Sequence, residues 1–249
     1  MRFLSKSDDA GVLRTVAMAA RHQIKLFYDV LSPYSYIGFH VMRRYQRIWD
    51  VSLQLRPVLI GGIFKNTKNA PPGLNKIKFD YMLTDLKRLA HTHQLPLSPA
   101  PNTMEYMFKG GSLQAMRLLT AVAADQPEAL EDVTVALFDR SWGKGVDINA
   151  ETSLQEACAA AKLPTDTAQN LIQASQTDRI KELLKSNTDA AQQYNIFGLP
   201  SFVIDDKDMY FGADRMDVIA AQLNEPWYGP LANPYQKDVQ ELMSGKAKL

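Results

Sequence analysis

The sequence predicts an α/β protein in which a strand–helix–strand unit and a strand–strand–helix unit are separated by a long helical segment. Three observations support this. Two β-rich runs flank an amphipathic helix within residues 24–59, helical patterns fill most of residues 74–194, and β patterns return in residues 201–211. Strands that alternate with a helix at the start of a chain favour a parallel pair joined by a crossover.

The composition is that of a globular protein with a substantial core. The chain has 249 residues, 46% of them hydrophobic and 22% charged. Its formal net charge of +1 gives no electrostatic drive toward nucleic acid or an anionic membrane, so neither is expected as a partner. No apolar run approaches the roughly 20 residues of a membrane span. The single cysteine, Cys158, lies among alanines and is predicted to be an inert thiol in the core.

The first unit begins with residues 24–29, which alternate apolar side chains as a strand does. Residues 30–49 then carry apolar side chains at helical spacing, with Ser32 at the N-cap and Pro33 at the first helical position. Residues 51–59 form the second strand. This order predicts a right-handed strand–helix–strand unit.

The middle of the chain is predicted to be a loop followed by helices. Residues 60–73 are rich in Gly, Asn and Pro and are predicted to be a loop. Ser112 and Thr177 are expected as helix caps. The expected helices are 74–94, 112–125, 127–142, 151–162, 165–175 and 178–194.

The last unit contains a hairpin. Residues 201–205 and 209–211 are expected as its strands, with a turn at 205–208, and Asp214 is expected to begin the final helix. The whole plan is that of a thioredoxin-like βαβ–ββα core split by a large all-helical insertion. The expected parts are a flexible extension (1–23), a split thioredoxin-like domain (24–73 and 195–225), a helical inserted domain (74–194) and a C-terminal tail (226–249).

Ser32 lies directly after a strand, at the mouth of a helix. Unpaired N–H groups and the positive end of the helix dipole stabilise an anion there, and a thiolate is such an anion. Redox proteins of this architecture carry C-x-x-C at this position, whereas this chain has Ser32, Pro33, Tyr34 and Ser35. Any thiol chemistry therefore uses sulfur from a ligand, to which Ser32 can donate a hydrogen bond. The alternative is that Ser32 only caps the helix.

Two further segments could bind such a ligand. Pro200, which follows Leu199 just before a strand, is typical of a cis-proline turn that leaves the preceding backbone open to an extended peptide, although an ordinary turn is the alternative. The glycine turn before Ala213 and Asp214 could hold a carboxylate on its amides and an amino group on Asp214, although Asp214 could equally be a plain N-cap. No metal site is expected, because His91 and His93 point to different helix faces.

Six stretches together carry a resemblance that spans residues 24 to about 230. They are LFYDVLSPYSYIGF, LQLRPVLIGGI, NAPPG, GSLQAMRLLTAV, FGLP and FGADRM. In order and spacing the chain closely resembles the kappa-class glutathione transferases. The resemblance implies a homodimer that uses glutathione as co-substrate, with no separate cofactor, and Ser32 as the catalytic residue. The glutathione-binding residues that it implies are Ser32, Pro33, Tyr34, Asn69, Leu199, Pro200, Ala213 and Asp214.

Two positions depart from the family pattern. Ala213 stands where the family usually has serine, which removes a hydroxyl contact and puts the affinity for glutathione in question. Tyr36 replaces a more typical tryptophan, which is a mild change in helix packing.

The function that the resemblance implies is conjugation of the glutathione thiolate to small electrophiles, with reduction of organic hydroperoxides as an additional activity. The alternative is a glutathione-dependent isomerase of the 2-hydroxychromene-2-carboxylate type. A third hypothesis is a non-enzymatic thiol-handling chaperone, which the absence of C-x-x-C disfavours. The tripeptide 247–249 (AKL) is a variant of a peroxisomal address, and family members are peroxisomal or mitochondrial, so peroxisomal localisation is expected with the mitochondrion as the alternative.

Overall fold

The computed structural model describes residues 21–99, 107 and 110–233. Most of the extension expected at 1–23 and the tripeptide at 247–249 lie outside the described residues. Within the described part of the chain, no helix is both long enough and apolar enough to cross a bilayer.

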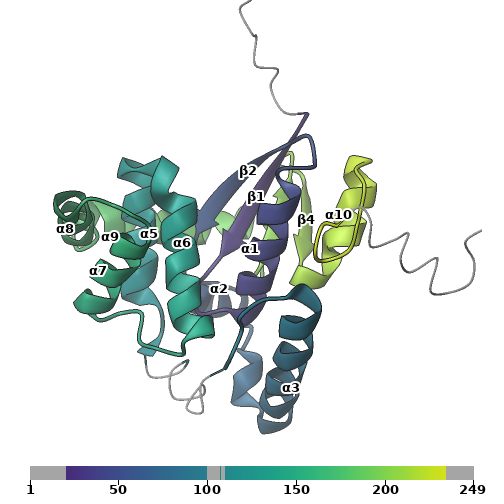
Figure 1. The fold of residues 1–249 in the computed structure, drawn as a ribbon, viewed down its shortest axis with the longest axis horizontal. Coiled ribbons are helices and arrows are strands. Elements are labelled where there is room, and N and C mark those ends of the chain that lie inside the picture. The colour runs from purple at the N-terminus through teal and green to yellow at the C-terminus, as the bar shows by residue number, and fades with distance from the viewer. Residues whose placement is uncertain (1–20, 100–106, 108–109, 234–249) are drawn as a thin grey trace, which may run out of the picture.

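A four-stranded sheet forms the centre of the protein (Figure 1). Its strands are β1 (His22–Tyr28), β2 (Val51–Pro57), β3 (Ser201–Ile204) and β4 (Asp208–Phe211). The order across the sheet is β2-β1-β3-β4. β1 pairs parallel to β2 and antiparallel to β3, and β3 pairs antiparallel to β4. The predicted α/β class and the βαβ–ββα order are therefore confirmed, with β1 at the centre beside both partners.

The helices surround this sheet. In Figure 1, helices α5 to α9 gather at the left of the sheet, α1 lies in front of it, and α3 lies below it. The long helical segment between β2 and β3 is thus present as predicted. The helices are α1 (Pro33–Tyr45), α2 (Ile60–Thr67), α3 (Lys76–His93), α5 (Leu113–Asp125), α6 (Leu130–Phe138), α7 (Glu151–Ala160), α8 (Thr165–Ala174), α9 (Asp178–Ala190) and α10 (Met216–Leu223).

The loop prediction for residues 60–73 was wrong for its first half. Residues 60–67 form α2, and a short 3-10 turn, Pro72–Leu74, precedes α3. Burial of Ile63, which is 1% exposed and packs against the sheet, stabilises this helix despite its glycines. Tertiary packing has overridden a low local propensity.

Smaller differences concern the ends of elements. The helix expected at 127–142 begins with a 3-10 turn, and its α-helical part ends at Phe138, before a wider π-helical turn, Asp139–Gly143. The final helix begins at Met216 rather than at Asp214, which lies in a 3-10 turn. Ser112 and Thr177 occupy N-cap positions as predicted, yet neither side chain bonds to the N–H groups of its own helix.

Alternation along the central strands divides the core between the two faces of the sheet. Ile24, Leu26 and Tyr28 of β1 face the larger core, to which α1, α5 and α6 contribute. Phe27 and Val203 face the smaller core on the other side, where Ile63 of α2 packs. Cys158 is completely buried in the larger core, which confirms its predicted core position, and burial raises the pKa of its thiol to about 11.

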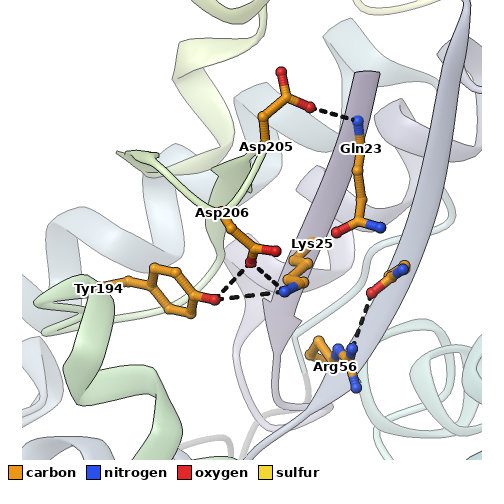
Figure 2. A network of polar contacts seen from close by, with 7 residues as sticks. Gln23, Lys25, Arg56, Tyr194, Asp205 and Asp206 are labelled. Atoms are coloured by element: carbon orange, nitrogen blue, oxygen red, sulfur yellow. Dashed lines mark hydrogen bonds and ion pairs between the residues drawn. The ribbon is translucent and has the colours of Figure 1, made fainter. Parts of the chain in front are cut away.

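A polar network fixes the end of the sheet at which β1 begins (Figure 2). Asp205 and Asp206 have φ of 49° and 59°, as in the tight turn that joins two hairpin strands. Lys25 pairs with Asp206, which also accepts a 2.6 Å bond from the Tyr194 hydroxyl, and Asp205 accepts from the Gln23 N–H at 2.8 Å. Tyr194 is the last residue of the 3-10 turn Ala191–Tyr194 that follows α9, so the network joins the end of the helical segment to the hairpin. The opposite end of β1 leads to Ser32.

Candidate functional site

Ser32 caps α1 as the sequence predicts. It follows the short turn after β1, and its own N–H donates to the Asp29 carbonyl at 2.9 Å. Its Oγ accepts a hydrogen bond from the Ser35 N–H at 3.1 Å, and Pro33 is the first helical residue. The side chain therefore lies at the positive end of the α1 dipole, where an anion is stabilised.

The cap leaves the hydroxyl proton of Ser32 available. A serine hydroxyl has one donor and two acceptor lone pairs, and the cap uses a lone pair. The proton is donated to the Leu199 carbonyl across 3.2 Å, which is long for an O–H···O bond. A bond of that length is readily exchanged for a stronger one to a thiolate. Capping and thiol activation are thus compatible roles of one side chain.

The Leu199–Pro200 peptide bond is cis, as predicted. This turn lies against the first half of α1, because a Cβ added to Gly38 would be only 3.0 Å from Pro200 Cγ. Pro200 is buried, and its carbonyl accepts the Gly212 N–H at 3.0 Å. These contacts hold the backbone of Leu199 beside the mouth of α1.

A cavity of about 490 Å³ opens at this point. Its size is that of a typical small-molecule site, and most of its walls are apolar, including Leu59, Phe64 and Met82. Five of the predicted site residues line it: Ser32, Pro33, Tyr34, Asn69 and Leu199. The structure therefore brings together residues that are up to 167 positions apart in the sequence, as the Ser32–Leu199 contact shows.

Asn69 forms part of the wall through two of its own bonds. Its Nδ2 donates to the Phe197 carbonyl at 2.9 Å, and its Oδ1 accepts from the Ala70 N–H at 2.8 Å. The first bond joins the loop after α2 to the segment before Pro200. This bond therefore links the two segments that line the cavity beside Ser32.

A second hollow of about 450 Å³ adjoins the first and shares Tyr34, Leu199 and Phe211 with it. Ala213 and Asp214 line this second hollow. Gly212 turns the chain with φ of 102°, and a Cβ there would be 2.4 Å from Asp214 Oδ1. Asp214 does not cap α10, because it lies in the preceding 3-10 turn, where its carboxylate pairs with Arg215 at 2.7 Å.

Tyr34 lies between the two hollows. Its hydroxyl donates to Asp85 Oδ2 of α3 at 3.0 Å. Burial, followed by the neighbouring charge of Asp85, raises the pKa of this hydroxyl. Tyr34 therefore remains a neutral donor at neutral pH and anchors α3 against α1.

One feature of this site, the buried carboxylate of Asp29, was not predicted from the sequence. Asp29 is completely buried, and its carboxylate accepts bonds from the Leu31 N–H at 2.9 Å, the Ile60 N–H at 2.8 Å and the Ser112 hydroxyl at 2.9 Å. Desolvation raises its pKa to about 6, although these three bonds act in the opposite direction. A lone acid between Tyr28 and Val30 in an apolar run was the signal that could have revealed it.

Among the residues that the structure describes, no three His, Cys, Asp or Glu side chains are grouped as a metal site would require.

Comparison of the chain with known proteins finds one matching family model and similarity to two kinds of enzyme. The DSBA-like thioredoxin domain model matches residues 23–224. The chain is 44% identical over 211 residues to glutathione S-transferase kappa 1 of Homo sapiens, covering 84% of this chain and 93% of that protein. It is 26% identical over 198 residues to 2-hydroxychromene-2-carboxylate isomerase of a Pseudomonas species, covering 78% of this chain and 86% of that protein.

Among solved structures, one of an isomerase of that name superposes with a TM-score of 0.68 at 18% identity, covering 91% of this chain and all of the other. At that identity the superposition establishes the shared fold and no more. It includes the helical segment inserted between β2 and β3.

Proposed function

The chain belongs to the kappa class of glutathione S-transferases, within the DSBA-like thioredoxin domain family, and we propose that Ser32 activates the thiol of glutathione for attack on small electrophiles. The observation that carries this role is the hydrogen-bonding state of Ser32. Its lone pair caps α1, while its proton makes only a 3.2 Å bond to the Leu199 carbonyl. That proton can turn to a thiolate sulfur without loss of the cap.

The proposed binding mode follows from the two hollows. The cysteinyl part of glutathione lies along the Leu199 backbone, so its sulfur meets Ser32 at the mouth of α1. The γ-glutamyl end extends past Tyr34 to Ala213 and Asp214, whose carboxylate balances the amino group. Asn69, which we also propose to contact glutathione, lines the first cavity, and the apolar walls of that cavity remain for the electrophile.

The reaction needs no covalent enzyme intermediate. The thiol proton leaves to solvent on binding, and the thiolate is stabilised by the Ser32 hydroxyl and the α1 dipole. The sulfur then attacks the electrophilic carbon, a C–S bond forms, and the leaving group departs with its electron pair. The protein contributes pKa lowering and positioning.

The isomerase is the alternative function, and the identities of 44% and 26% to the two relatives favour the transferase. A direct test supplies the purified protein with glutathione and a chlorinated nitroaromatic, with an organic hydroperoxide in a parallel assay. We expect stoichiometric loss of glutathione thiol with the aromatic. Interconversion of an isomerase substrate without loss of glutathione, together with no conjugation, would overturn the transferase assignment.

We also propose that the protein is a homodimer. The described surface supports this with three exposed apolar side chains at the start of α3. They are Leu74 in the preceding 3-10 turn and Ile77 and Tyr81 in α3, which are 68%, 81% and 60% exposed. Sedimentation analysis tests it, with a dimer expected. A monomer at micromolar concentration would contradict the proposal.

Peroxisomal localisation through the tripeptide 247–249 is a further proposal, with the mitochondrion as the alternative. A fluorescent protein fused to the N-terminus of the chain should reach peroxisomes, and removal of the three residues should leave it outside them. Unchanged distribution after the deletion would contradict the proposal.

A further inference from the structure

Asp29 is the only charged side chain that is completely buried among the residues that the structure describes. It lies just after the last residue of β1, three positions before Ser32. Ionised carboxylates are rarely buried without a specific set of donors, because desolvation of the charge is costly. The groups that donate hydrogen bonds to the Asp29 carboxylate therefore indicate the role of this residue.

The three donors to Asp29 come from three separate segments of the same cavity wall. They are the Leu31 N–H in the turn before α1, the Ile60 N–H at the start of α2 and the Ser112 hydroxyl at the start of α5. Leu31, Ile60 and Ser112 all line the 490 Å³ cavity that Ser32 also lines. The buried carboxylate thus links three segments of the chain that line one cavity.

Two helices depend on this carboxylate at their N-termini. The residue before α2 is Leu59, whose side chain cannot cap, so Asp29 accepts the first N–H of α2 in its place. Ser112 does not bond to the N–H groups of α5 and instead directs its hydroxyl to Asp29. The start of α1 is linked to the same point, because the Asp29 carbonyl accepts the Ser32 N–H.

We propose that Asp29 is a positioning residue of the thiolate site, where its carboxylate fixes the starts of α2 and α5 around the cavity and its charge limits how far the glutathione thiol is acidified. This inference rests on the proposed function of Ser32. Three positive helix ends meet at the cavity, and a buried negative charge beside them offsets part of their field. A thiolate that is stabilised too strongly is a poorer nucleophile.

The groups that face Asp29 are uncharged, so an effect of its charge can be assigned to Asp29 itself. Helices α2 and α5 present a main-chain N–H and the Ser112 hydroxyl, and the turn before α1 presents a main-chain N–H. The titratable neighbour is Tyr28 of β1, whose pKa is raised by burial and, to a smaller extent, by the charge of Asp29. The Tyr28 hydroxyl bonds to Thr134 and stays neutral, so the charge at this point is that of Asp29.

Stability alone does not account for an ionisable group here. Burial raises the pKa of Asp29 to about 6, so the charged form is disfavoured in the folded state relative to the unfolded state. A neutral side chain would avoid this cost.

The experiment compares three variants with the wild-type protein. Asp29→Asn removes the charge and can accept from Leu31 or Ile60 but not from both, because an NH2 group, which only donates, replaces the second oxygen. Ser112→Ala removes only the bond to α5 and keeps the charge. Thr134→Val is the matched control, because it breaks a buried 2.7 Å hydrogen bond to Tyr28, next to Asp29, and neither Thr134 nor Tyr28 lines the cavity.

Three quantities are measured for each protein: the pKa of bound glutathione from thiolate absorbance, the KM for the electrophile, and the Tm. We expect Asp29→Asn to increase the acid ionisation constant of the bound thiol about three- to tenfold and to raise the electrophile KM by a similar factor. Ser112→Ala should raise the KM about threefold without acidifying the thiol. Thr134→Val should lower only the Tm.

If Asp29→Asn changes only the Tm, as Thr134→Val does, Asp29 is a structural residue and the inference is overturned. If Asp29→Asn does not fold, an unchanged electrophile KM in Ser112→Ala overturns it instead. A wild-type protein whose bound glutathione titrates like the free thiol contradicts the proposed function of Ser32 itself. That result is recognised before any variant is compared.

Discussion

Replacement of Ser32 by alanine tests the proposed chemistry most directly, because the structure separates two consequences of losing one hydroxyl. The lone pair that accepts the Ser35 N–H at 3.1 Å is lost, which costs about 1 kcal/mol of stability as for other N-caps. The hydroxyl proton that we propose is donated to the thiolate is also lost. A hydrogen bond to a charged group contributes about 1.5–3 kcal/mol, which corresponds to about one to two pKa units of the thiol.

The rate effect follows from the thiolate fraction. Each unit of pKa changes the thiolate fraction tenfold below the pKa, so Ser32→Ala should lower turnover at pH 7 by about ten- to a hundredfold. The loss should shrink as the pH rises toward 9, where the thiol ionises without help. The glutathione KM should change less than threefold, because the Leu199 backbone and the second hollow remain.

Ser35→Ala is the matched control. Ser35 is buried in the same helix, one turn away from the mutated residue, and its Oγ has no hydrogen-bond partner among the described residues. Its removal should leave the pH profile of turnover unchanged. The assay is the steady-state rate of conjugation between pH 6 and 9, with the Tm of each protein.

Two results would refute the reasoning. Equal turnover of Ser32→Ala and wild type across pH 6–8 would show that the hydroxyl does not activate the thiol. An equal loss in Ser35→Ala would assign the effect to helix packing.

Four further predictions concern stability, the second hollow and the buried thiol. The raised pKa of Asp29, about 6 against an ordinary 3.8, means that the folded state binds the proton more tightly, so its charge destabilises the fold above pH 6 and this cost disappears as the pH falls toward 4. In urea unfolding, the difference in unfolding free energy between Asp29→Asn and wild type should therefore shift in favour of the variant by up to about 3 kcal/mol from pH 4 to pH 8. A difference that stays constant over this range would contradict the burial of the charge. Gly212→Ala should raise the glutathione KM several-fold with little change in kcat, since φ is 102° and the new Cβ would displace Asp214; an unchanged KM would place the γ-glutamyl end elsewhere. Ala213→Ser should lower the glutathione Kd about fivefold in calorimetry if the added hydroxyl makes one net hydrogen bond, and no change would show that the backbone amide suffices. Cys158→Ala should keep full activity and the native Cys158 should resist alkylation at pH 8, because burial raises its thiol pKa to about 11; rapid labelling of the folded protein would contradict this.

Local sequence determined a large part of the fold and, within the site, the helix cap at Ser32 and the cis bond before Pro200. Strand alternation, the serine followed by proline at 32–33 and the proline at 200 each encode their own conformation over a few residues, and the structure has the strand, the N-cap and the cis bond where these signals stand. The missing C-x-x-C restricted the chemistry to sulfur supplied by a ligand. The same local reasoning failed at 60–67, where glycines indicated a loop and packing of Ile63 produced a helix.

Only the tertiary structure decided how the site is assembled. Ser32 meets Leu199 and the cavity that Asn69 lines because β1 pairs with β3 at the centre of the sheet, and no local pattern specifies that pairing. The role of Asp29 depends on donors 31 and 83 residues further along the chain. Hydrogen bonds and desolvation act between groups that folding brings together, so a short sequence window can encode the cap at Ser32 but not the buried charge beneath it.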